Sequence, residues 1–111
     1  MRVVHVVHNY WPVVGGIEGV VKGLAEGMTK RGHEVHVITS NYSSKGRIKE
    51  EVVEGVHVHR IKSVRFVFPD LTYPLDVPRE LLKSADVLHG HSQNSLFTVK
   101  MIEEAKSLSA K

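Results

Sequence analysis

The chain has 111 residues, which is enough for one hydrophobic core but not for two ordinary domains. Apolar side chains make up 41% of it and charged ones 24%, a composition typical of a folded globular domain and not of a disordered chain. The net charge of +3 is spread along the chain and does not indicate nucleic acid as a partner. Cysteine is absent, so disulfides, thiol nucleophiles and cysteine-type zinc sites are excluded.

The first third of the chain has the pattern of a strand, a crossover helix and a second strand. Four valines predict a buried strand at residues 2–8, and this apolar run is too short for a signal peptide or a membrane span. Apolar residues then recur at helical spacing from Ile17 to Met28, and residues 30–32 form a helix-stop signal of two cations and a glycine. A β-branched strand follows at residues 35–39. Such a unit is right-handed and parallel in nearly all proteins, so we expect a mainly parallel sheet.

The rest of the chain continues this α/β pattern. Two short β-branched runs flank Glu54-Gly55, which predicts a hairpin, whereas three prolines between residues 64 and 78 argue against long regular structure there. A short helix beginning at Pro78, a strand at 86–91 and a helix at 95–106 follow. We therefore predict one α/β domain over residues 1–111. Because a parallel sheet that ends on a strand and a helix usually continues, we expect this domain to be the first part of a larger protein.

The helix that starts near residue 16 contains an unusual number of glycines. Gly15-Gly16 precedes its first turn, where unpaired backbone amides and bare main chain favour an anion such as phosphate; the alternative is that the pair only permits a tight entry turn. The glycines do not form the dinucleotide fingerprint, so NAD is not expected. Gly19, Gly23 and Gly27 each cost helix propensity, which predicts close approach of another element to this helix.

Histidines occur as two His-x-His pairs, His57/His59 and His89/His91, and residues two apart in a strand point to the same face. Neither pair has a third ligand at a suitable spacing, so we expect no metal site. His91 differs because it sits at the carboxyl end of its strand, as His8 and Asn9 do on the first strand. Ligands of open parallel sheets bind outside such ends, so these three residues are candidate site residues.

Other chemistry has less support. No Ser-His-Asp order or nucleophile elbow occurs, which leaves hydrolase chemistry without a basis. Arg60, Lys62 and Arg65 lie beside aromatic residues and suit either an anionic membrane surface or, as we expect, a solvated face.

In the helix at 95–106, we expect Leu96 and Val99 on or near the inner side, together with Met101 and Ile102.

Three segments occur in the order and spacing of one known family: residues 12–18 (PVVGGIE), 30–35 (KRGHEV) and 86–91 (DVLHGH). Over residues 1–105 the chain resembles the N-terminal domain of retaining GT-B glycosyltransferases of family 4, also called group 1. The resemblance implies a Rossmann-like mainly parallel sheet with flanking helices, which is part of the N-terminal half of a GT-B fold. In that fold two such domains face a cleft, the first holding largely the acceptor and the second largely the nucleotide-sugar donor.

The resemblance also implies roles for particular residues. The backbone of Gly15 and Gly16 would meet the donor's diphosphate, and His91 would be the catalytic residue near the transferred sugar and the acceptor. Retention in this family is attributed to a front-face route without a covalent enzyme intermediate, so no nucleophile is expected here. No cofactor is expected either. Catalysis would rest on orientation and on stabilising the leaving diphosphate. Glu18 and Glu26 have the spacing of the family's E-x7-E motif, but that motif belongs to the second domain, so the match is coincidental.

Together these patterns predict the N-terminal part of a glycosyltransferase that moves a sugar from a nucleotide-diphosphate sugar to an unidentified sugar or lipid-linked acceptor. The expected location is cytoplasmic, and the sequence leaves open whether the protein also associates with a membrane surface. The chain would need the C-terminal donor-binding domain of the same protein and would be inactive without it. One alternative is a stand-alone α/β module that binds phosphate, a nucleotide or a partner, which the short length favours. A histidine-based zinc protein is another.

Overall fold

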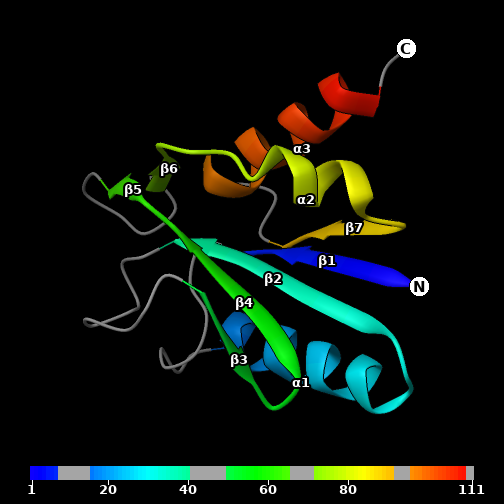
Figure 1. Ribbon diagram of the computed structural model, residues 1–111. Coiled ribbons are helices and arrows are strands. Elements are labelled where there is room, and N and C mark those ends of the chain that lie inside the picture. Colours follow the sequence, from blue (N-terminus) through cyan, green and yellow to red (C-terminus); the bar gives the residue numbers. More distant parts are fainter. Residues whose placement is uncertain (8–15, 41–49, 66–71, 92–95, 110–111) are drawn as a thin grey trace.

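The computed structural model describes residues 1–7, 16–40, 50–65, 72–91 and 96–109, and its centre is a five-stranded sheet (Figure 1). In sheet order the strands are β3 (Glu50–Val53), β4 (Val56–Ile61), β2 (Glu34–Ser40), β1 (Arg2–Val6) and β7 (Val87–Gly90). Strands β4, β2, β1 and β7 are parallel, and only β3, at one edge, is antiparallel to its neighbour. The prediction of a mainly parallel α/β sheet is therefore confirmed.

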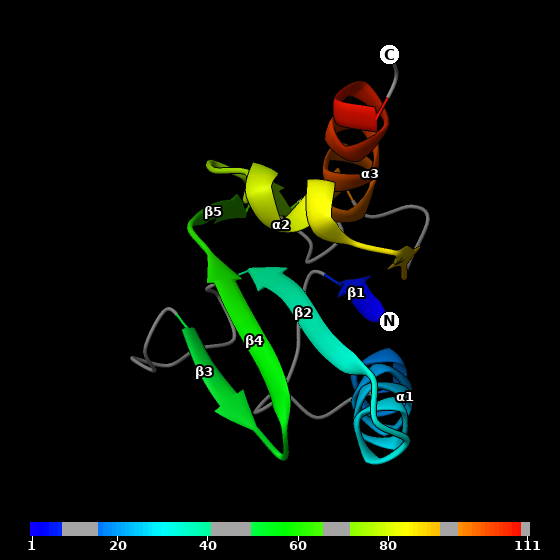
Figure 2. The same cartoon turned by 45° about the vertical axis from the view of Figure 1, so that its right-hand side comes forward.

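Helices cover both faces of this sheet (Figures 1 and 2). One face carries α1 (Gly16–Lys30), and the other carries α2 (Arg79–Ser84) and α3 (Leu96–Ser109). A small antiparallel pair, β5 (Ser63–Arg65) and β6 (Thr72–Pro74), lies beside α3. Among the described residues, no helix combines the length and the apolar character that crossing a lipid bilayer requires.

The alternation of side chains along each strand builds two separate cores. Val35 and Val37 of β2 point to the α1 face, where they pack with Val21 and Ala25 of the helix. Val4 and Val6 of β1 point to the other face and pack against Phe97 of α3. Because the sheet is buried on both sides, its central strands are almost continuous runs of β-branched residues.

The predicted contact faces of the helices need correction. Val20 and Leu24 of α1 are 59% and 40% exposed, whereas Val21 and Ala25 are fully buried. The expected inner residues Leu96 and Val99 of α3 are likewise exposed, whereas Met101 is buried as expected and Phe97, which was not expected on the inner side, is buried as well. Only part of the apolar stripe of α1 therefore contacts the described part of the sheet, and the remaining apolar residues of the stripe are exposed.

The prediction that other elements approach the glycines of α1 closely is wrong. A Cβ atom added at Gly19, Gly23 or Gly27 would meet no atom within 4 Å beyond the helix's own backbone. Gly23 is two positions from both Val21 and Ala25, and two residues turn about 200° around a helix axis. The glycines therefore lie away from the sheet.

Two predicted turns are confirmed. Gly32, with φ of +91°, ends α1 in a left-handed conformation; its N–H bonds to the carbonyl of Thr29, and the N–H of His33 bonds to that of Met28. Between β3 and β4, Glu54 and Gly55 both have positive φ, 51° and 82°, as a two-residue hairpin turn requires. These ends fix the register of the strands that follow them.

Candidate functional site

His91 directly follows β7 and is held from two sides through its backbone. Its N–H donates to the carbonyl of Val6 at 2.8 Å, which extends the pairing between β7 and β1 by one residue. Its carbonyl accepts a hydrogen bond from Oγ1 of Thr98 in α3 at 2.7 Å. The residue is 8% exposed. The structure thus places His91 at the carboxyl edge of the sheet, as the sequence predicts, in a fixed backbone position.

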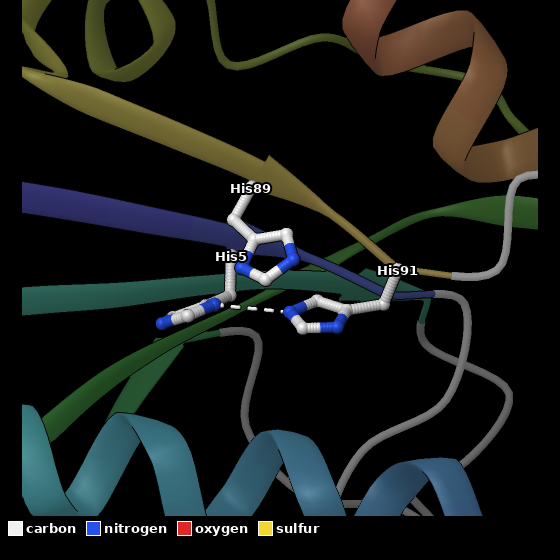
Figure 3. Close-up of side chains that lie close together, drawn as sticks. All are labelled: His5, His89 and His91. Carbon is white, nitrogen blue, oxygen red and sulfur yellow. Dashed lines mark hydrogen bonds between the residues drawn. The ribbon is translucent and has the colours of Figure 1, made fainter.

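The ring of His91 meets a second histidine that sequence reasoning missed. His5 lies in β1, fully buried, and its Nδ1 is 3.0 Å from Nε2 of His91 (Figure 3). One of these two nitrogens donates a hydrogen to the other. Within the described part of the chain, Nε2 of His5 has no hydrogen-bond partner although it is buried. The backbone and the ring of His91 are therefore both restrained.

His89 completes a cluster of three histidines on the α1 side of the sheet (Figure 3). It is in register with His5 across the β1–β7 pair, so both side chains point to the same face. The rings of His89 and His91 are stacked with centroids 4.1 Å apart, and the ring of His5 lies 5.5 Å from that of His89. His89 is exposed, whereas His5 and His91 are buried. We call these three residues the β1–β7 histidine cluster.

Burial keeps the two inner imidazoles neutral. Loss of solvent, with smaller contributions from the charges of His91 and His89, lowers the pKa of His5 to about 4. Loss of solvent, followed by the charge of His89, also lowers the pKa of His91 to about 4. At neutral pH each ring therefore has one N–H donor and one acceptor nitrogen. His91 is suited to hydrogen bonding with a neutral group and not to carrying a charge.

The N-terminus of α1 lies at the same edge of the sheet. The helix begins at Gly16 and runs antiparallel to the strands, so its first turn lies near the ends of β1 and β2, as the blue end of α1 in Figure 1 shows. Backbone N–H groups in a first turn are unpaired and attract anions. Of the other sequence-predicted site residues, His8, Asn9 and Gly15 lie outside the described residues.

The other predicted histidine pair lies elsewhere in the sheet, in β4. His59 is 2.9 Å from His36 of β2, and the second ring nitrogen of His36 contacts Glu34 at 2.6 Å. His57 stacks on His36 with the ring centroids 4.7 Å apart. Burial, followed by the charge of His36, lowers the pKa of His59. In the sheet, β2 and β1 separate β4 from β7, so the two predicted pairs do not form one site.

The expectation of a solvated basic face is wrong for Arg60. Its side chain is fully buried and forms an ion pair with Glu51 at 2.6 Å, from the neighbouring strand of the β3–β4 hairpin. Alternation along β4 places Arg60 on the same inward-facing side as Val58, which the sequence pattern alone did not resolve. Lys62, two residues later, is exposed as expected.

Residues 14–103 match the sequence profile of glycosyltransferase family 4. This chain belongs to that family. The match covers the helix that begins at Gly16 as well as His89 and His91, so the candidate site is built largely from residues of the family domain. The resemblance stated from the three motifs is confirmed.

Three proteins named as glycosyltransferases are also similar to this chain in sequence. This family 4 chain is 35% identical over 79% of its length to an uncharacterized glycosyltransferase of Methanocaldococcus jannaschii. It is 35% identical over 71% of its length to a GDP-mannose-dependent alpha-mannosyltransferase of Mycolicibacterium smegmatis. It is 26% identical over its whole length to a phosphatidylinositol N-acetylglucosaminyltransferase component of Arabidopsis thaliana. The matched regions are 22%, 21% and 26% of those proteins, so the chain spans about a quarter of their length or less. No solved structure matches the chain.

Proposed function

We propose that this chain is the acceptor-side, N-terminal part of a retaining glycosyltransferase that uses a nucleotide-diphosphate sugar. The observation that carries the proposal is the fixed, neutral imidazole of His91 at the sheet edge where α1 begins, in a chain of glycosyltransferase family 4. A sugar next to His91 and a diphosphate next to the first turn of α1 would lie at one edge of the sheet.

The two halves of this site have different chemistry. The backbone amides of the first turn of α1 at Gly16, extended by Gly15, would bind the diphosphate and stabilise the charge that develops on it as the glycosidic bond to the sugar breaks. The neutral ring of His91 would hydrogen-bond a hydroxyl of the sugar and orient the reacting carbon. His8 and Asn9, which follow β1 in the sequence, would contact the acceptor.

No residue of this site needs to act as a nucleophile in the proposed reaction. The acceptor hydroxyl attacks the anomeric carbon from the side that the leaving diphosphate vacates, so the configuration is retained. The name of the GDP-mannose-dependent relative favours a nucleotide-sugar donor, and the name of the phosphatidylinositol N-acetylglucosaminyltransferase relative favours a lipid-linked acceptor over a free sugar. The donor itself would be held largely by a C-terminal domain of the same protein, and the 111 residues alone would be inactive.

The test uses the complete gene product, read to its own stop codon, with a panel of nucleotide-diphosphate sugars. Release of nucleoside diphosphate measures transfer or donor hydrolysis, and proton NMR of the product reports the anomeric configuration. We expect retention, and we expect His91→Ala to lower kcat about 10²-fold, the scale of losing one well-placed hydrogen-bonding group. His57→Ala, in the other histidine group, is the matched control and should leave kcat unchanged. An inverted product, full activity of His91→Ala, or no reaction with any donor would reject the proposal.

A further inference from the structure

The β1–β7 histidine cluster supplies the third ligand that the sequence analysis did not find. His5, His89 and His91 each offer one ring nitrogen, and these three nitrogens lie within 4.8 Å of one another. They come from two adjacent strands whose register is fixed by the β1–β7 pairing. The His-x-His pair at the end of β7 thus gains its partner from β1, 84 residues before His89 in the chain.

The spacing of the nitrogens is close to what a tetrahedral metal ion requires. A zinc–nitrogen bond of about 2.0–2.1 Å places two ligand nitrogens about 3.3–3.4 Å apart. The observed 3.0 Å between Nδ1 of His5 and Nε2 of His91 differs from this by a few tenths of an ångström. The nitrogen of His89 has further to move, and its exposed side chain can do so by rotation without displacing the core.

We propose that His5, His89 and His91 form a binding site for one divalent transition-metal ion, of which zinc is the representative. Three imidazoles suit zinc, cobalt, nickel or copper, whereas magnesium and calcium require oxygen ligands, and no carboxylate of the described residues belongs to the cluster. The ion would replace the hydrogen shared by His5 and His91, and the ring that donated it would carry its N–H on the other nitrogen. Its fourth position would be open on the exposed side, next to His89.

The second histidine group provides an internal comparison. Both ring nitrogens of His36 are engaged, one by His59 and one by Glu34, and the described residues of this group do not bring three ligand atoms together as the β1–β7 cluster does. We therefore expect the metal at one group only. This inference rests on the geometry of the cluster and not on the proposed sugar transfer, although both assign a role to the ring of His91.

The test is isothermal titration of the metal-free 111-residue chain with zinc chloride, followed by titration with cobalt chloride, whose visible absorption reports the ligand geometry. We expect one ion per chain and the intense visible bands of four-coordinate cobalt. His89→Asn removes the exposed ligand without opening a cavity and should raise the Kd for zinc at least about tenfold and abolish the cobalt bands, with an unchanged circular dichroism spectrum. His57→Asn, which removes an exposed histidine of the other group, should change neither.

Three results would overturn the site: no binding to the wild-type chain, binding that His89→Asn leaves intact, or binding that His57→Asn weakens as much as His89→Asn does. The last result would show that exposed histidines bind the ion without the geometry of the cluster. None of these results bears on nucleotide-sugar binding, which is measured separately.

Discussion

His5 and His91 reach the candidate site by different routes, and only one of them could be predicted from the sequence. His91 follows the end of a strand, and in parallel sheets that position is where ligands bind. His5 is surrounded by valines in the middle of β1 and has the sequence environment of a core residue. Its role depends on β1 and β7 being neighbours, and strand order is not contained in the local pattern of either strand.

The two buried imidazoles predict that the chain loses stability in acid. In the unfolded chain a histidine titrates near pH 6.5, whereas burial lowers the pKa of His5 and His91 to about 4. Between these values the unfolded chain binds more protons than the folded chain, so the free energy of unfolding decreases as the pH falls. The contribution is complete above about pH 6.5 and is lost progressively toward about pH 4.

Urea unfolding of the metal-free chain, with EDTA present, at several pH values in this window measures the effect. His91→Asn removes one of the two groups and should reduce the pH slope of the free energy of unfolding. His59, whose pKa is also lowered by burial, remains in that variant, so part of the slope should persist. A free energy of unfolding that is constant or increases as the pH falls would contradict the neutral, buried state of the pair.

Arg60 gives a second prediction at the scale of one residue. Its buried guanidinium is paired with Glu51, so Glu51→Gln leaves a buried charge without that carboxylate. We expect a loss of about 2–3 kcal/mol in the free energy of unfolding, below the full cost of breaking a completely buried pair because Glu51 is 15% exposed. Glu50→Gln, at an exposed neighbouring position, should change it by less than about 0.5 kcal/mol. Equal effects of the two variants in urea unfolding would show that the pair contributes nothing specific.

At the scale of elements, the packing of α3 on β7 depends on one glycine. A Cβ at Gly90 would lie 2.8 Å from Cγ2 of Thr98 and 3.2 Å from two side-chain atoms of Ile102. Thr98 also holds the carbonyl of His91, so close contact between helix and strand contributes to the position of the candidate site. This explains why a residue without a side chain stands at the end of this strand.

Gly90→Ala should therefore lower the free energy of unfolding by about 1–3 kcal/mol, because the added methyl group forces α3 away from the strand. Gly23→Ala is the matched control: its Cβ would meet nothing within 4 Å, and alanine should stabilise the helix by up to about 1 kcal/mol. Thermal or urea unfolding of both variants gives opposite signs if this packing is correct. A stabilising Gly90→Ala would be incompatible with the contact between β7 and α3.

At the scale of the whole molecule, local sequence patterns determine some features of the fold but not others. The β-branched runs on either side of α1 and the glycine that ends this helix predicted the mainly parallel sheet, and the Glu54-Gly55 turn predicted the antiparallel hairpin, because each depends on local backbone preferences. The faces of α1 and α3 were predicted less well: apolar periodicity marks a wide stripe on each helix, but the area of the sheet beneath it decides which residues are buried. The metal-binding geometry could not be predicted, because its nitrogens come from strands that are distant in sequence.

The candidate site likewise depends on the whole fold, because its parts come from distant segments of the chain. The first turn of α1 follows β1 in the chain, whereas His91 follows β7, and the parallel arrangement brings both to one edge of the sheet (Figure 1). A glycosyltransferase of this family would use that edge to hold the diphosphate and the sugar of one donor molecule. The central functional claim is that His91 contacts the sugar and that the amides at Gly16 contact the diphosphate.

Calorimetry with paired ligands tests this claim most directly: a nucleotide-diphosphate sugar and the corresponding nucleoside diphosphate are each titrated into the complete gene product and its His91→Ala variant. The account predicts that the variant binds the nucleotide sugar at least about tenfold more weakly, a loss of about 1.4 kcal/mol, and binds the nucleoside diphosphate with unchanged affinity. Equal affinities of variant and wild type for the sugar donor, or equal losses for both ligands, would contradict it.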